Sequence, residues 1–369
     1  MLNVNSETAS RTADAGTLLR GITVEAIAQA CETSPDELWR LARNSKLLFK
    51  LPRQQRKKGG GFRVIYPPTK THKPLLKRMA RFLSRQIPVH SAAHGGVKGR
   101  SSFTSAAKHL GATVLVVRDI EECYPSIGPQ ALANALKRLG ASPSLAKFLS
   151  SIMTVDGQIP QGGPLSSLAL NLFFYRQDEH LHRKARRVRG AYTRLADDLV
   201  ASVGDTETGA AMGREFDSAI SSRHLRVNAS KRAKKGLLGG DKLKEIHSLI
   251  VNSRRGLRPK DEHVQKALRF LQNYCRRCRS ATPADLESLA YLRRVVCGWM
   301  YYMRQAARSP ARHMRKQIHL ADARVTQMLK KHAIQAKKNK WWVLSSKRNE
   351  PRRLAAQWVW REVNAARAG

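Results

Sequence analysis

Three aspartates in this sequence stand where apolar runs end, and carboxylates in such places can do metal-dependent chemistry. Asp119 follows the apolar, β-branched run 112–117, and Asp197 and Asp198 lie within residues 191–203, which predict a strand, a tight turn and a strand. If these elements are neighbours in one sheet, the three carboxylates converge at one edge. Oxygen ligands suit Mg²⁺, and two such ions about 3.5–4 Å apart can drive phosphoryl transfer. The three aspartates therefore predict a two-metal centre.

Each part of this pattern is common when it stands alone, because an Asp-Asp pair is most often ordinary turn chemistry. The order of three stretches is more specific. These stretches are residues 119–124 (Asp-Ile-Glu-Glu-Cys-Tyr), 161–166 (Gln-Gly-Gly-Pro-Leu-Ser) and 195–198 (Leu-Ala-Asp-Asp). In this order and at these intervals they resemble the successive palm motifs of reverse transcriptases. The resemblance implies an RNA-directed DNA polymerase that uses two Mg²⁺ ions.

A narrower resemblance is to the reverse transcriptases of bacterial retrons. It rests on three further stretches and one histidine: residues 192–199 (Tyr-Thr-Arg-Leu-Ala-Asp-Asp-Leu), residues 94–102 (His-Gly-Gly-Val-Lys-Gly-Arg-Ser-Ser) with His109, and residues 60–68 (Gly-Gly-Phe-Arg-Val-Ile-Tyr-Pro-Pro). Residues 228–231 and 249–252 fit the next two positions of the pattern, so the resemblance spans about Val24 to Asn252.

The sequence also departs from the retron pattern at three places. Leu195 stands where an aromatic residue is usual, Ser167 replaces a proline, and residues 246–248 read Ile-His-Ser instead of Val-Thr-Gly. None of these changes removes a carboxylate, so they weaken the subfamily assignment and leave the expected catalysis intact.

The resemblance assigns a role to individual residues. Asp119, Asp197 and the backbone carbonyl of Ile120 are the expected metal ligands, and Asp198 is expected near the primer terminus. The residues expected to bind the incoming dNTP are Lys57, Lys58, Arg63, Tyr124, Gln161, Gly162 and Lys231.

The chemistry of these side chains suits a nucleotide, with an alternative for each. The ring of Tyr124 would act as a steric gate against a ribose 2′-hydroxyl, or it is simply a buried core tyrosine. Arg63 can pair bidentately with phosphate oxygens, whereas Lys57 and Lys58 act as point charges and can equally form a solvated turn. Lys231 could assist protonation of the leaving pyrophosphate, although it is one lysine among many.

Contacts to the nucleic acid are expected at three further places. A turn that grips the primer would consist of His247, Ser248 and Leu249. Candidate RNA contacts are His94, Lys98, Arg100, His109, Trp341 and Trp342. The histidines can equally be structural. Trp299, Tyr301 and Tyr302 could also stack on unpaired bases, or they belong to a helical core.

The charge of the chain indicates a polyanionic partner. Lys and Arg number 68 against 27 Asp and Glu, which leaves a net charge of +41. The alternative, a cationic protein at a membrane surface, lacks the amphipathic basic helix or lipidation signal that it needs. No signal peptide and no run near the ~18 apolar residues of a membrane span is present. One Cys-x-x-Cys, Cys275 and Cys278, is a weak zinc signal, and both are expected to be helix residues. We expect a cytoplasmic, reducing location without membrane contact.

The elements that must position these residues predict an α/β (α+β) right hand. The expected parts are N-terminal helices in residues 1–50, fingers and a palm sheet in 51–240, a primer grip and helical thumb in 241–330, and a basic tail in 331–369. Helices are expected at 74–87, 129–138, 144–153 and from 164 to 183, and basic helices from about 261. Ser34 predicts a helix start with Pro35 at its first position and Glu37 closing a capping box.

The retron resemblance implies a complete activity that no residue here demonstrates. Such an enzyme binds a structured noncoding RNA, primes from an RNA 2′-hydroxyl and uses dNTPs to copy part of that RNA, giving an RNA–DNA hybrid and branched RNA–DNA (msDNA). It commonly acts with an effector protein in antiphage defence. Few residues follow the expected thumb, which favours a polymerase without ribonuclease H or maturase parts. The alternatives are another bacterial reverse transcriptase, abortive-infection or group II intron-derived, and an RNA-binding scaffold without catalysis.

Overall fold

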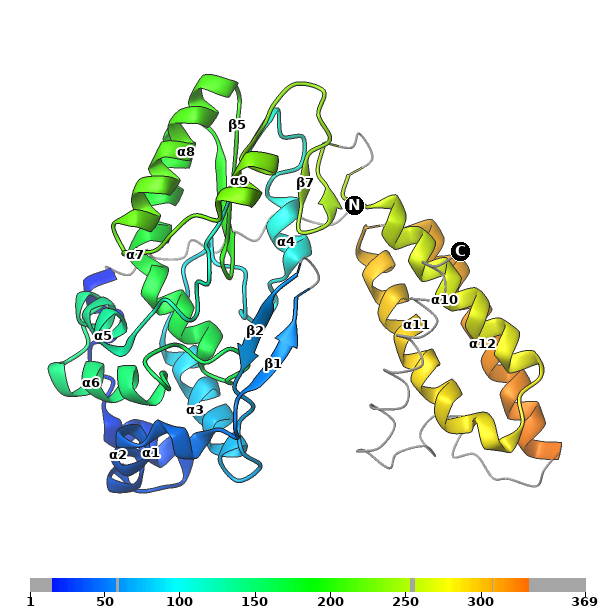
Figure 1. Cartoon of the computed structure of the whole chain (residues 1–369), viewed down its shortest axis with the longest axis horizontal. Helices are drawn as coiled ribbons and strands as arrows, with labels where there is room; N and C mark the ends of the chain where they lie inside the picture. Colours follow the sequence, from blue (N-terminus) through cyan, green and yellow to red (C-terminus); the bar gives the residue numbers. More distant parts are fainter. Residues whose placement is uncertain (1–14, 58–59, 253–255, 307, 332–369) are drawn as a thin grey trace. The chain divides into compact units, whose positions relative to one another are not determined.

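The computed structural model describes residues 15–57, 60–252, 256–306 and 308–331 of the chain. The chain divides into two compact units, Met1–Ile246 and His247–Gly369. Figure 1 shows a mixed helix-and-sheet first unit and a second unit built from long helices. No helix among the described residues is long and apolar enough to cross a membrane.

The N-terminal helices of the first unit are α1 (Val24–Cys31) and α2 (Pro35–Arg43). Ser34 caps α2 as predicted, since its hydroxyl accepts a hydrogen bond from the backbone N–H of Glu37 (3.2 Å). The capping box is not completed, because the Glu37 carboxylate instead accepts from Arg40 Nε (2.6 Å). The buried side chains of both helices belong to the same hydrophobic cluster as those of the central helices. The expected N-terminal extension therefore shares its core with the rest of the unit.

A two-stranded hairpin, β1 (Arg53–Arg56) and β2 (Phe62–Ile65), follows and is antiparallel with Arg56 opposite Phe62. Between the strands, the N–H of Lys57 donates to the carbonyl of Gly61 (2.9 Å). Almost all of its side chains are exposed. The hairpin leads through α3 (His72–Gln86) and the short helix α4 (Ser102–Ala107) into the central sheet.

The central sheet has four strands in the order β4-β5-β3-β6, and all neighbours are antiparallel. Their bounds are Val114–Asp119 for β3, Ala191–Leu195 for β4, Asp198–Val203 for β5 and Leu237–Leu238 for β6. The strand β3 begins two residues later than the apolar run suggested and ends on Asp119 itself. In the long ladder between β3 and β5, Val114 pairs with Val203 and Asp119 pairs with Asp198.

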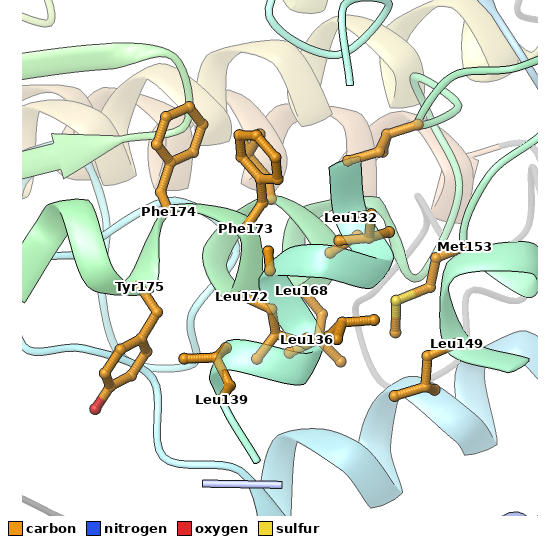
Figure 2. Packing of buried hydrophobic residues seen from close by; sticks show 14 of the residues in the cluster. Leu132, Leu136, Leu139, Leu149, Met153, Leu168, Leu172, Phe173, Phe174 and Tyr175 are labelled. Atoms are coloured by element: carbon orange, nitrogen blue, oxygen red, sulfur yellow. The ribbon is translucent and has the colours of Figure 1, made fainter. Parts of the chain in front are cut away.

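Four longer helices among the described residues complete this part of the first unit: α5 (Pro129–Arg138), α6 (Pro143–Ile152), α7 (Ser166–Arg187) and α8 (Thr206–Ser221). Of these, α7 and α8 contact the sheet, and α5 and α6 pack beyond α7. Figure 2 shows Leu132 and Leu136 of α5 close to Leu168 and Leu172 of α7, within the largest cluster of buried side chains. Burying such leucines contributes about 1.5–3 kcal/mol each. The helix α7 begins at Ser166, because the predicted start at Pro164 lies in the preceding turn.

Two glycines let α8 approach the sheet closely. A Cβ on Gly209 would lie 2.9 Å from Cγ1 of Val114, and a Cβ on Gly213 would lie 2.7 Å from Nη2 of Arg118. Both distances are shorter than real Cβ atoms show, so a side chain at either position would force its neighbours to shift. The short helix α9 (Ala229–Lys235) follows, and β7 (Glu245–Ile246) ends the first unit.

The second unit begins with β8 (Leu249–Ile250) and β9 (Arg258–Pro259), which are antiparallel partners. Three helices follow: α10 (Asp261–Arg279), α11 (Leu286–Ala306) and α12 (Arg308–Lys331). Their buried side chains form a separate hydrophobic cluster. Cys275 and Cys278 lie within α10, as expected for helix residues. Among the described elements are also short 3-10 helices at Ala15–Thr17, Ser45–Leu48 and Pro283–Asp285.

Candidate active site

The three predicted aspartates meet at one edge of the central sheet. Asp119 ends β3 and stands directly opposite Asp198, the first residue of β5. Asp197 lies in the two-residue turn that joins β4 to β5, and its carbonyl accepts a hydrogen bond from the N–H of Ile120 (3.1 Å). The sheet register therefore brings together residues that are almost 80 positions apart in the sequence.

Burial and the closeness of the other carboxylates raise the pKa of both Asp119 and Asp197. Burial, followed by the charges of Asp198 and Asp119, raises the pKa of Asp197 to about 6. Burial also raises the pKa of Asp119; the bond from Lys231 opposes this rise, and a hydrogen bond with Asp198 adds to it. Like charges held together in a partly buried place favour either a shared proton or a bound cation.

A cation from the chain already contacts this cluster. Lys231, on α9, donates from Nζ to Oδ1 of Asp119 at 2.5 Å. The helix α9 is capped by Asn228, whose side chain accepts from the N–H of Lys231 (3.2 Å) and whose own N–H donates to the carbonyl of Asp119 (2.8 Å). Burial lowers the pKa of Lys231, but the bond and charge of Asp119 outweigh it and raise the pKa overall. Two separate contacts thus fix α9 against the end of β3.

These residues fit a divalent cation in their chemistry. Asp119, Asp197 and Asp198 supply only oxygen ligands, and the ammonium of Lys231 already binds one of them, which indicates a place that prefers positive charge. No group of three acidic, histidine or cysteine side chains among the described residues forms a ready-made metal centre.

A buried ion pair lies beneath the turn that carries Asp197. Arg194 of β4 and Asp178 of α7 are both fully buried, and Arg194 Nη2 lies 2.7 Å from Oδ2 of Asp178. Burial lowers the pKa of Arg194, yet the charge of Asp178 more than offsets this and raises the pKa overall. Arg194 also contacts the turn itself, because its Nη1 donates to the carbonyl of Ala196 (2.9 Å).

Sequence reasoning did not single out Arg194 or Asp178. A signal was available, because an arginine inside a strand predicted to be buried needs a partner. Asn171, Phe174 and Asp178 recur at spacings of three and four along α7, so they share one face of that helix, and all three contact Arg194.

The expected nucleotide-binding residues lie near the β1–β2 hairpin and the turn before α7. Arg63 is exposed on β2, and the carbonyl of Gln161 accepts from the N–H of Tyr66 directly after that strand (2.8 Å). Gly162 has a φ of +96°, and a Cβ there would lie 3.1 Å from Cγ2 of Ile65. The side-chain oxygen of Gln161 is buried without a hydrogen-bond partner, so its capacity to accept a hydrogen bond is unused. Lys58 lies outside the described residues.

Tyr124 lies in the turn after β3, not on a helix, and is half-buried. Burial, followed by the nearby charge of Asp197, raises the pKa of Tyr124 to about 12, while a hydrogen bond with the side chain of Ser167 opposes this rise. The expected gate residue is therefore beside the aspartate cluster. Ser167, which replaces a proline of the retron pattern, is one of its partners.

The segment expected to contact RNA is partly buried against the active-site hairpin. His94 and His109 are only 4% and 1% exposed. The ring nitrogens of His109 bond Ser202 (2.9 Å) and Thr193 (2.8 Å). This placement fits the structural alternative for both histidines, and their RNA contact stays a prediction.

Two other residues of the same segment differ from each other. Arg100 is half-buried and donates from Nη1 to the carbonyls of His90 (2.7 Å) and Ala93 (2.6 Å), which again indicates a structural role. Lys98 is exposed, and its RNA contact stays a prediction.

The expected primer grip lies at the start of the second unit. His247 and Ser248 both have positive φ, +50° and +67°, as a tight turn requires, and Leu249 is fully buried. The hydroxyl of Tyr302 donates to the carbonyl of Ser248 (3.3 Å). Trp341 and Trp342 lie outside the described residues.

An aromatic pocket of about 350 Å³ opens beside that turn, lined by His263, Val295, Gly298, Trp299 and Tyr302. The rings of His263, Trp299 and Tyr302 are each 5.7 Å from one another between centroids. Nζ of Lys266 lies 6.0 Å from the centroid of Trp299. The flat ring of Trp299, next to other aromatic rings and a lysine, suits stacking on a base as well as it suits packing in the helical core.

Comparison with known proteins places this site in context. Residues 55–252 match the family model described as reverse transcriptase (RNA-dependent DNA polymerase). The chain is similar to the retron Mx65 reverse transcriptase of Myxococcus xanthus, with 34% identity over 167 residues that cover 40% of this chain and 39% of that protein. It is also similar to the retron Ec86 reverse transcriptase of Escherichia coli, with 27% identity over 57% of this chain and 71% of that protein.

The retron Se72 reverse transcriptase of Salmonella heidelberg is 29% identical over 38% of this chain and 37% of its own length. The chain thus spans well under half of the Mx65 and Se72 proteins. Among solved structures, telomerase from Candida albicans aligns with a TM-score of 0.43 and 12% identity, over 84% of this chain and 65% of that one.

Proposed function

Because the chain belongs to the reverse transcriptase (RNA-dependent DNA polymerase) family, we propose that it is a retron-type RNA-directed DNA polymerase. The observation that carries the proposal is the convergence of Asp119, Asp197 and Asp198 at one edge of the sheet. The retron assignment is supported by the similarity to the Mx65, Se72 and Ec86 reverse transcriptases. The net charge of +41 supports a nucleic-acid substrate.

We assign the metal-binding role to Asp119, Asp197 and Asp198 together with the backbone carbonyl of Ile120, and Asp198 would also lie beside the primer end. Two Mg²⁺ ions held there would supply the positive charge that activates the primer hydroxyl and stabilises the leaving pyrophosphate. Lys231 stands 2.5 Å from Asp119, with its proton firmly bound, and can give that proton to the pyrophosphate as it leaves.

The remaining site residues would bind and select the nucleotide. Arg63 and Lys57 would hold the triphosphate, while the backbone of Gly162 and the side-chain oxygen of Gln161 would lie against the nucleotide. Tyr124 would exclude the 2′-hydroxyl of an rNTP. The variant Tyr124→Ala should then accept rNTPs more readily, and an unchanged preference for dNTPs would remove this role.

The substrate proposed for this site is the structured noncoding RNA of a retron, which serves as template and primer. The enzyme would extend from an RNA 2′-hydroxyl with dNTPs and produce branched RNA–DNA (msDNA), acting with an effector protein in antiphage defence. His247, Ser248 and Leu249 would hold the primer strand.

Templated synthesis is tested by dNTP incorporation on an RNA template with Mg²⁺. Asp197→Asn should lower the rate about 10⁴-fold, since several kcal/mol of transition-state stabilisation are lost, while RNA affinity stays unchanged. The control Asp36→Asn changes the same charge at an exposed helix position and should retain full activity. Substantial synthesis by Asp197→Asn would contradict the assignment.

The retron proposal needs a separate experiment. Nucleic acid that co-purifies with the chain from its native host should be sequenced and tested for a 2′–5′ branch. A covalent RNA–DNA branch is the expected result. Bound RNA without attached DNA, together with templated synthesis in vitro, would instead favour another kind of bacterial reverse transcriptase.

A further inference from the structure

Asp197 is held through both of the peptide groups that flank it. In the peptide group that follows Asp197, the carbonyl of Asp197 accepts a hydrogen bond from the N–H of Ile120 (3.1 Å). In the peptide group that precedes Asp197, the carbonyl of Ala196 accepts from Arg194 Nη1 (2.9 Å). Since a peptide group is planar, holding its oxygen also fixes the nitrogen of the next residue. The backbone of Asp197, and with it the origin of its side chain, is thus set from two directions.

The turn needs such restraint because its backbone is strained. Ala196 has a φ of +56°, in the left-handed region that a residue with a Cβ rarely adopts. Such a conformation costs about 1–3 kcal/mol and persists only when its surroundings enforce it. The tight turn that presents Asp197 would relax without that enforcement.

Arg194 is itself held almost rigidly. Its Nε donates to both oxygens of Asp178 (2.9 and 3.2 Å), and its Nη2 donates to Asp178 (2.7 Å) and to Asn171 (3.1 Å). The guanidinium carbon lies 4.9 Å from the ring centroid of Phe174. The fork of two parallel bonds leaves the guanidinium one orientation, and in that orientation Nη1 points at the carbonyl of Ala196.

A second contact bears on the same turn from the segment 92–96. A Cβ on Gly95 would lie 2.6 Å from the backbone nitrogen of Ala196, so only glycine fits there. The carbonyl of Gly95 accepts from Nδ2 of Asn171 (3.0 Å), and Oδ1 of the same asparagine accepts from Arg194 Nη2. Gly95 and Arg194 are therefore linked through Asn171 and both press on Ala196.

We propose that Arg194, anchored by Asp178, is a positioning residue that fixes the Ala196–Asp197 peptide and so sets the Asp197 carboxylate for metal binding, with Gly95 as the opposing contact. Arg194 does not touch the substrate and takes no part in the reaction itself. The inference rests on the proposed polymerase function only where activity is the readout.

The test compares two pairs of variants. Arg194→Lys keeps the charge but loses the bidentate fork, and its matched control is Arg293→Lys, from an equivalent Arg–Asp fork in α11. Gly95→Ala pushes on Ala196 without removing a charge. Its control is Gly204→Ala, at a position with ordinary φ where a Cβ meets nothing within 4 Å.

Three quantities are measured on the full chain: the Mg²⁺ dependence of single-turnover dNTP incorporation, the rise in melting temperature that Mg²⁺ alone produces, and RNA affinity. We expect Arg194→Lys and Gly95→Ala to need about tenfold more Mg²⁺ for half-maximal rate, which corresponds to about 1.4 kcal/mol. Both should lose most of the Mg²⁺-induced thermal shift while RNA affinity stays within twofold. Both control variants should behave as wild type in Mg²⁺ dependence.

Wild-type Mg²⁺ dependence in a folded Arg194→Lys chain would overturn the proposal. If Arg194→Lys does not fold, Gly95→Ala takes its place, and wild-type Mg²⁺ dependence in that variant would overturn the proposal. If wild type binds Mg²⁺ but incorporates no dNTP, the polymerase proposal fails, and the thermal shift still decides whether Arg194 positions Asp197.

Discussion

The two units of this protein each contain an Arg–Asp fork, fully buried in the first unit and partly buried in the second, and the two forks serve different ends. In the first unit, Arg194 and Asp178 have side chains that are 0% exposed, and the guanidinium also binds the backbone of a strained turn. In the second, Arg293 and Asp322 are 17% and 13% exposed. There the carboxylate also accepts from the hydroxyl of Tyr274, so it joins side chains of α10, α11 and α12.

The comparison shows that an Arg–Asp ion pair can either join helices to one another or fix the turn that carries a candidate catalytic residue. The fork of the second unit connects three regular elements, each of which has its own backbone hydrogen bonds. In the fork of the first unit, Arg194 also donates a hydrogen bond to the carbonyl of Ala196, which lies in the turn next to Asp197. Substitutions in the first fork should therefore lower catalytic activity, whereas substitutions in the second should affect only the packing of the helical unit.

The largest expected effect is on stability. Asp178→Asn leaves a fully buried guanidinium without its counter-charge and should lower the free energy of unfolding by about 3–5 kcal/mol. Asp322→Asn should cost about half of that, because its partner can reach some solvent. Urea denaturation of each variant, followed by circular dichroism, measures both values. Equal losses would remove the distinction between the two forks.

The next effect concerns Asp197 in the chain freed of metal by chelation. Its pKa is raised from the usual 3.8 to about 6, so the folded chain binds this proton more tightly than the unfolded chain does. The resulting stability is fully present below pH 4 and is lost as the pH rises through 6, by about 3 kcal/mol.

Asp197→Asn removes this proton linkage. In chelator, its melting temperature should exceed that of wild type at pH 7.5 and approach it at pH 4, and Asp36→Asn should show no such crossover. A constant difference between Asp197→Asn and wild type from pH 4 to 7.5 would contradict the raised pKa.

The smallest expected effect separates binding from chemistry. Trp299→Ala, in the aromatic pocket of the second unit, should weaken RNA binding by about 1–2 kcal/mol, the amount typical of one stacked base. Leu320→Ala, at an apolar position of α12 that is 46% exposed and outside the pocket, is the control. Fluorescence anisotropy of labelled RNA gives both affinities. No loss for Trp299→Ala would mean that its ring serves only the helical core.

Much of this organisation could be predicted from the sequence, because local rules decide it. The apolar run before Asp119, the hairpin around Asp197 and the helix start at Ser34 were read from periodicity and capping residues. The motif order also gave the reverse transcriptase family, which the match over residues 55–252 confirms.

Contacts between distant segments could not be predicted in the same way. Nothing local to His109 indicates that its ring bonds Thr193 and Ser202, which lie 84 and 93 positions away. For Arg194 the sequence indicates that a partner is needed, but that Asp178 supplies it depends on how α7 packs against β4. His94 and His109 were candidate RNA contacts because they lie in a basic chain, and tertiary packing places both side chains in the interior.

The central claim is that Asp119, Asp197 and Asp198 together hold divalent cations, and cation binding tests it most directly. Mn²⁺ can replace Mg²⁺ as a spectroscopic probe, and electron paramagnetic resonance counts the free ion during titration into the chain with template, primer and dNTP. Wild type should bind a pair of ions that Mg²⁺ displaces, and Asp119→Asn should lose at least one of them. Equal binding by wild type and Asp119→Asn would contradict the account.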